Sequence, residues 1–112
     1  MEKVFNKLVR DKIPDLMASS GVTVTFKSLH GEKLRKALKD KLIEETQEVV
    51  AAESYDKLLE ELADVSEVVE HLLRVHGFSK ADLEKAMADK RICNGSFLKG
   101  YFLEKAEDVE NG

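Results

Sequence analysis

The sequence is poor in cysteine, proline and tryptophan. It has one cysteine, Cys93, which excludes an internal disulfide and has no clear His or acid partner. Proline occurs once and tryptophan is absent, so little in the 112 residues interrupts helix formation. No apolar run is long enough to span a membrane, and no signal or transit segment is recognisable. We therefore expect a cytoplasmic protein without membrane contact.

Basic residues are also fewer than acidic ones. Lys and Arg number 18 against 22 Asp and Glu, which gives a net charge of −4. A protein that binds nucleic acid through phosphate contacts normally has the opposite sign, so no nucleic-acid partner is expected. A small polyanionic ligand remains compatible with this charge if metal ions mediate the contact.

Helix-forming residues dominate what is present. The length fits one domain over residues 1–112, and 43% hydrophobic residues suffice for one modest core. This composition predicts a mainly all-α fold, an antiparallel bundle of about four helices with a short β segment near each end. Amphipathic helices in so short a chain often need a partner to complete their core, so a homo-oligomer is expected, a dimer or a tetramer.

Four helices and two short strands can be placed on the sequence. The helices are expected from an N-cap at Asp11 to about Ser19, over 32–53, over 55–75, and from a cap at Ser79 to about Arg91. Residues 22–29 (VTVTFKSL) and 97–103 (FLKGYFL) are expected to form short strands that can pair. Because very few residues join the second and third helices, these two should be antiparallel neighbours.

Two glutamates lie on the apolar stripes of these neighbouring helices. At about 100° per residue, Glu45 shares a stripe with Leu38 and Val49, and Glu61 shares one with Leu72. An unpaired charge in an apolar seam is costly, and two such charges on facing helices also repel each other. A divalent cation between them would remove both costs.

Each of these glutamates is followed three residues later by another acid, in the pairs Glu45–Glu48 and Glu61–Asp64. Mg²⁺ prefers oxygen ligands and keeps some water while it binds a few carboxylates and substrate phosphates. The two pairs can therefore form a Mg²⁺ site, which Mn²⁺ could also fill. The competing interpretation is a helix hairpin whose acids pair with Lys41, Lys57 or basic residues of a partner subunit.

The acids also form a pattern that resembles a known family. Residues 44–48 (EETQE) and 61–64 (ELAD) resemble the EExxE…ExxD signature of the MazG-like all-α NTP pyrophosphohydrolases. Residues 7–14 (KLVRDKIP) are similar to the opening motif of a small house-cleaning, phosphoribosyl-ATP pyrophosphohydrolase-like branch, and residues 95–99 (GSFLK) to its closing segment. Gly100 departs from the pattern, because related sequences often have a further base there.

The resemblance implies Mg²⁺-dependent hydrolysis of a nucleoside triphosphate, noncanonical ones included, to a monophosphate and pyrophosphate. It also implies a bundle built from two subunits. The implied metal ligands are Glu45, Glu48, Glu61 and Asp64. Either Glu44 or one of the ligands, such as Glu45, would orient the attacking water. From the sequence alone, Glu44 could hold a water or a second metal, but an ordinary surface acid is the favoured interpretation. Candidate phosphate-binding bases are Lys7, Arg10, Lys12, Lys90 and Lys99.

An alternative function stays open beside this one. The chain could be a non-catalytic helical dimerisation module, or a nucleotide sensor, with a degenerate site. The base that is missing at Gly100 favours this alternative.

Overall fold

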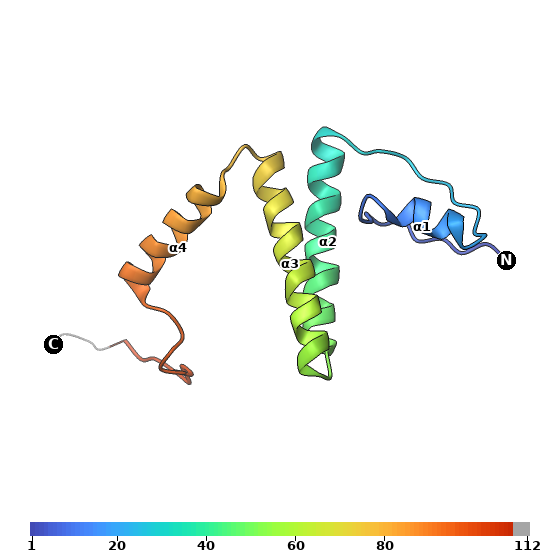
Figure 1. Ribbon diagram of the computed structural model, residues 1–112. Coiled ribbons are helices and arrows are strands. Elements are labelled where there is room, and N and C mark those ends of the chain that lie inside the picture. The colour runs from blue at the N-terminus through green and yellow to red at the C-terminus, as the bar shows by residue number, and fades with distance from the viewer. Residues whose placement is uncertain (109–112) are drawn as a thin grey trace. The chain divides into compact units, whose positions relative to one another are not determined.

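The computed structural model describes residues 1–108, in which four helices are the only regular elements. They are α1 (Ile13–Ser19), α2 (Gly31–Ala51), α3 (Tyr55–Val75) and α4 (Lys80–Asn94) (Figure 1). The all-α prediction is confirmed. The chain forms two compact units, one over residues 1–80 and the other from Ala81 onward. The prediction of a single domain stays a prediction.

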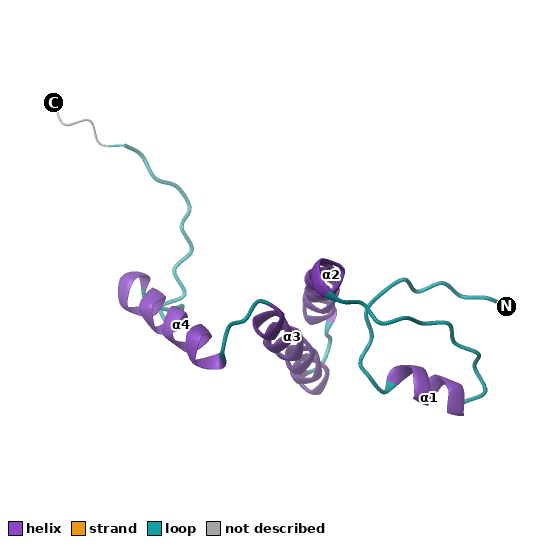
Figure 2. Ribbon diagram, turned by 90° about the horizontal axis from the view of Figure 1, so that it is seen from above, coloured by secondary structure: helices purple, strands orange, loops and turns teal. Residues whose placement is uncertain are grey.

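Helices α2 and α3 form an antiparallel hairpin, as expected from their short connection. They lie side by side in both views of the chain (Figures 1 and 2). Residues 52–54 join them, and the Ser54 hydroxyl caps α3 by accepting a hydrogen bond from the Lys57 backbone N–H at 3.1 Å. Such a cap satisfies one of the backbone donors left free at a helix start. Within residues 1–80, all described, α1 packs on neither helix.

The core of the hairpin is very small. Its buried apolar residues are Leu38 on α2 and Val68 on α3, and no described side chain is completely buried. Glu61 is as buried as these two, with 6% of its surface exposed against 5% for Leu38 and 8% for Val68. The hairpin therefore buries a carboxylate in the place where a larger core would hold another apolar side chain.

The opposite side of the hairpin is apolar and open. Ile43 and Val50 on α2, and Tyr55, Leu59 and Leu62 on α3, are all exposed. On each helix these positions recur at helical spacing, which places them away from the carboxylates. We call these five residues the apolar side of the hairpin. None of the described helices is both long enough and apolar enough to cross a membrane.

The two predicted strands are absent from the described residues, and that prediction is wrong. Residues 22–29 run without regular structure, and no backbone hydrogen bond is recorded for residues 23–29. Residues 97–103 contain a turn, in which the Gly100 N–H donates to the Phe97 carbonyl at 3.1 Å and Gly100 adopts a positive φ of 60°. A strand needs a partner for its ladder, and the two segments belong to different units.

Several helix ends also differ from expectation, and α2, expected over 32–53, runs from Gly31 to Ala51. Helix α1 begins at Ile13 with Lys12 at its N-cap, which makes no side-chain cap, so Asp11 is not the cap. Pro14 fixes the start, because its ring suits the first turn and lacks a donor that would otherwise stay unpaired. Helix α4 continues three residues past Arg91 and ends at Asn94, directly before Gly95, whose φ is 81°.

Candidate metal centre

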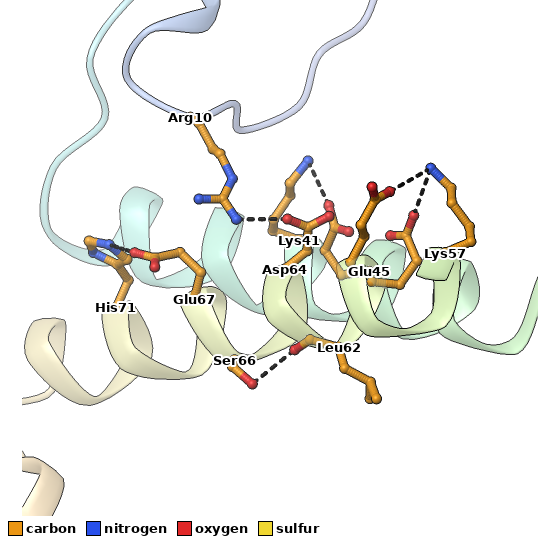
Figure 3. A network of polar contacts seen from close by, with 11 residues as sticks. Arg10, Lys41, Glu45, Lys57, Leu62, Asp64, Ser66, Glu67 and His71 are labelled. Atoms are coloured by element: carbon orange, nitrogen blue, oxygen red, sulfur yellow. Dashed lines mark hydrogen bonds and ion pairs between the residues drawn. The ribbon is translucent and has the colours of Figure 1, made fainter. Parts of the chain in front are cut away.

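Three carboxylates from the hairpin converge on one point. Glu45 projects from α2, and Glu61 and Asp64 project from α3. One oxygen atom of each lies within 4.8 Å of the others. Figure 3 shows Glu45 and Asp64 on the same side of the hairpin, with Leu62 and Ser66 pointing away. The convergence follows from helical geometry, because residues three apart share a face and the two helices are antiparallel neighbours.

The three carboxylates differ in their exposure to solvent. The side chain of Glu61 is 8% exposed, that of Glu45 12% and that of Asp64 36%. Exposure in the cluster therefore increases from Glu61, which is buried between the two helices, to Asp64, which lies at the solvent-exposed edge. Buried carboxylates need a compensating positive charge, because desolvation of an unpaired charge is strongly unfavourable.

The chain itself supplies a base to each carboxylate. Lys41 lies 3.3 Å from Glu45, and Lys57 lies 3.3 Å from Glu61. A third contact, 2.7 Å long, joins Arg10 of the N-terminal segment to Asp64 (Figure 3). The ion pairs of the competing interpretation, through Lys41 and Lys57, are thus present. Both partners of the Arg10–Asp64 pair are open to solvent, and such pairs contribute only about 0.2–1 kcal/mol because water screens them.

The oxygen donors of the three carboxylates are of the type that a divalent cation takes, and they lie near enough to close on one. Mg²⁺ binds oxygens at about 2.0–2.1 Å, so opposite ligands of its octahedron stand about 4.2 Å apart. At least two of the three pairs would be neighbouring ligands, about 2.9 Å apart, so oxygens that lie within 4.8 Å of one another would have to approach by up to about 2 Å. Three carboxylates fill half of an octahedron and leave positions for water and phosphate oxygens. Hard oxygen donors are also the ligand type that Mg²⁺ and Mn²⁺ prefer.

Glu44 stands beside the cluster and is held by two lysines. Lys7 donates to one carboxylate oxygen at 2.9 Å, and Lys41 donates to the other at 3.2 Å. Burial alone would raise the pKa of Glu44, but the hydrogen bonds from Lys7 and Lys41 outweigh it and lower that pKa. The hydrogen bond with Glu44 in turn raises the pKa of Lys7. Glu44 is therefore ionised at neutral pH, next to the three converging carboxylates.

The other predicted site residues lie outside the group of three converging carboxylates. Glu48 is exposed and lies outside the group of three, so its role as a ligand stays a prediction. Lys12 is exposed at the start of α1. Lys90 and Lys99 belong to the second unit, where the Lys99 ammonium lies 5.7 Å from the centre of the Tyr101 ring. For these bases, phosphate binding also stays a prediction.

The ionic partners of the N-terminal bases could not be anticipated. Lys7 and Arg10 became candidates through the resemblance of residues 7–14, but nothing in that motif names Glu44 or Asp64. The two contacts join residues 37 and 54 positions apart. Such pairs depend on how the N-terminal segment folds back on the hairpin, and local periodicity carries no signal for that.

Comparison with known proteins adds one relative. A protein of Mycolicibacterium smegmatis, described only as uncharacterized, is 43% identical over 54 residues, which cover 48% of this chain and 55% of that protein. The chain thus spans about half the length of the curated relative it matches. No protein-family model matches the chain, and no solved structure matches it. The functional argument therefore rests on the residues of this chain.

Proposed function

We propose that this chain is a Mg²⁺-dependent nucleoside triphosphate pyrophosphohydrolase of the small house-cleaning branch of the MazG-like superfamily. One observation carries the proposal. Acids of both halves of the EExxE…ExxD pattern, Glu45 with Glu61 and Asp64, converge from facing helices. Two bases of the opening motif, Lys7 and Arg10, contact acids of the same two halves.

In this proposal, three acids bind the metal and a fourth acts on the attacking water. Glu45, Glu61 and Asp64 would hold the ion, which when bound neutralises phosphate charge and lowers the pKa of a water molecule. Glu44, which is ionised, can orient that water toward the α-phosphorus of the substrate. The water oxygen would form a bond to the α-phosphorus while its proton passes to Glu44, and the bond from the α-phosphorus to its bridging oxygen would break as pyrophosphate leaves with that oxygen.

The substrate would enter at the open edge of the cluster. Asp64 is the most exposed of the three carboxylates, and Arg10 lies directly on it. A guanidinium matches the geometry of phosphate oxygens and binds them in pairs. Arg10 and Lys7 therefore suit the triphosphate chain, and the deeper Glu61 suits the ion.

The proposal is tested by a substrate panel. The protein is incubated with Mg²⁺ and the common and modified nucleoside triphosphates, and pyrophosphate and monophosphate are measured. We expect equal amounts of both products from at least one nucleotide. A folded sample that binds metal but turns over no member of the panel would contradict the enzymatic part of the proposal.

The proposal includes a homo-oligomer, a dimer or a tetramer. The buried core of one hairpin contains only Leu38 and Val68 as apolar residues, while the apolar side stays open. A second hairpin would cover that side and complete a bundle of helices. Location in the cytoplasm stays a prediction.

A non-catalytic helical module is the second candidate, and the ion pairs favour it. Lys41, Lys57 and Arg10 already neutralise the three carboxylates, so the hairpin does not require a metal to be stable. This candidate predicts that Mg²⁺ does not raise the melting temperature. Binding of Mg²⁺ to the folded state alone would raise it.

A further inference from the structure

We infer that Arg10 is a displaceable counter-ion, which a divalent cation drives off Asp64 and which then binds the phosphates of the substrate. Metal binding would thus free the Arg10 guanidinium for the triphosphate. This inference rests on the proposed function, because it requires a metal at the three carboxylates.

The N-terminal segment reaches across both helices of the hairpin. Residues 1–10 form no helix or strand, yet Lys7 pairs with Glu44 on α2 at 2.9 Å and Arg10 pairs with Asp64 on α3 at 2.7 Å. Figure 3 shows Arg10 extending from this segment onto Asp64, at the edge of the cluster. The segment is therefore fastened beside the open edge by two side-chain contacts.

Each acid of the cluster has a basic partner without a metal. Its acids, Glu44, Glu45, Glu61 and Asp64, are paired with the bases Lys7, Arg10, Lys41 and Lys57. Lys57 also contacts Glu60 at 3.5 Å, so its positive charge is shared between two acids. A divalent cation at the three carboxylates would lie close to these bases and repel them, so a base that is free to move should give way.

Of the three bases that contact the converging carboxylates, Arg10 can leave most freely; Lys7, on the same segment, pairs with Glu44, which is not one of the three. Lys41 is four residues from Glu45 on α2, and Lys57 is four residues from Glu61 on α3, so both helices keep these lysines near their acids. Arg10 has no such tether, because its segment is not helical and Asp64 is 54 residues away. Its side chain is also more than half exposed, so water screens the pair.

Displacement has two consequences of opposite sign. Removal of the Arg10 guanidinium should strengthen metal binding, because the cation no longer competes for Asp64. The same removal should weaken binding of the triphosphate in the presence of metal, because a charge-assisted contact is lost. A purely structural role for Arg10 would weaken both.

The experiment titrates Mn²⁺ into the full chain by calorimetry without nucleotide, and then titrates a non-hydrolysable nucleoside triphosphate into the Mn²⁺-saturated protein. For Arg10→Ala we expect Mn²⁺ to bind about threefold more tightly, in line with a screened ion pair. We expect the nucleotide to bind about tenfold more weakly. Arg10→Gln, which keeps much of the side-chain bulk, should behave likewise.

Lys12→Ala is the matched control for the metal titration. It removes one positive charge two residues away, from a side chain with no recorded ion pair in the described residues. Its Mn²⁺ affinity should stay at the wild-type level. If Lys12→Ala and Arg10→Ala change that affinity equally, or if Arg10→Ala weakens or leaves unchanged the binding of Mn²⁺, the inference is overturned.

Glu61→Gln separates this inference from the proposed function. If Mn²⁺ binds the wild type and not Glu61→Gln, the metal site stands, and the Arg10 variants alone decide the inference. If both proteins bind Mn²⁺ equally, or neither binds it, the proposed site is wrong and the inference is overturned with it.

Discussion

The two sides of the α2–α3 hairpin differ in chemistry: one carries clustered acids that are paired with bases, and the other carries exposed apolar side chains. On the carboxylate side, each clustered acid already has a base within the chain, and Glu61 is nearly as buried as Leu38. On the apolar side, large side chains have no cover, with Val50 88% and Leu59 70% exposed. Large apolar side chains that are exposed together on one side of a helix pair are candidates for an interface. Under the proposal, the carboxylate side would bind a metal ion and the apolar side would contact a second copy of the chain.

The largest effect should come from Glu61→Gln on the carboxylate side. We expect a loss of at least about 100-fold in kcat/KM, since loss of an outer partner of a metal ligand alone costs about 10–100-fold. The fold should be retained or become more stable, because the change removes a buried charge.

Glu60→Gln is the control for this effect. Glu60 is the neighbouring residue on α3 and shares Lys57 as a partner, but its side chain is 68% exposed. It should keep close to full activity. Equal losses in the two variants would show that general charge, and not the buried position of Glu61, determines activity.

The family resemblance and the helical periodicity predicted the positions of the clustered acids, but not the contacts that the N-terminal segment makes with them. The bounds of α3, Tyr55–Val75, were predicted as observed, because a serine cap and the glycine that follows the helix are local signals. The seam positions of Glu45 and Glu61 followed from periodicity alone. The Arg10–Asp64 contact could not be predicted, because it depends on a chain reversal between residues 54 positions apart.

The predicted strands failed for a related reason. The pattern of residues 22–29 favours an extended backbone, but a strand forms only where another strand pairs with it. The expected partner, residues 97–103, is interrupted by the turn that ends at Gly100. Local sequence patterns therefore predicted the helices, because a helix forms its hydrogen bonds within one segment. They failed for these two segments, because a strand needs a second strand to pair with.

The apolar side should respond next most strongly, to Leu59→Lys. If a second copy covers this side, each copy loses about 1.5–3 kcal/mol of interface free energy, the usual value for burying a leucine. Sedimentation velocity should then show the oligomer dissociating at concentrations where the wild type stays assembled.

Glu53→Lys is the control for that change. Glu53 is an exposed residue of the α2–α3 connection, and this substitution also adds positive charge. It should leave assembly intact. If Leu59→Lys changes neither assembly nor unfolding free energy by more than about 0.5 kcal/mol, Leu59 lies on a free surface.

The smallest effect concerns the Lys7–Glu44 pair at the border of the carboxylate side. The pKa of Glu44 is lowered from its ordinary 4.5, so the pair stabilises the fold above that value and the stabilisation is lost as pH falls through the lowered pKa. The pKa of Lys7 is raised from 10.5, so on the alkaline side the stabilisation is lost as pH rises through the raised pKa.

Urea unfolding across these pH limits measures this contribution. We expect about 0.2–1 kcal/mol at neutral pH, because both side chains are partly exposed. Lys7→Met should flatten both limbs of the pH profile, whereas Lys12→Met should leave them as in the wild type. An unchanged profile in Lys7→Met would mean that the pair does not contribute in solution.

Thermal unfolding with and without Mg²⁺ tests the central claim most directly, namely that the three converging carboxylates bind a divalent cation. At a Mg²⁺ concentration about 100 times its dissociation constant, the folded state should gain about 2.7 kcal/mol, which appears as a higher melting temperature. We predict this gain for the wild type and for Glu60→Gln, and its absence in Glu61→Gln. A wild type that does not respond to Mg²⁺, or a Glu61→Gln variant that responds equally, would contradict the account.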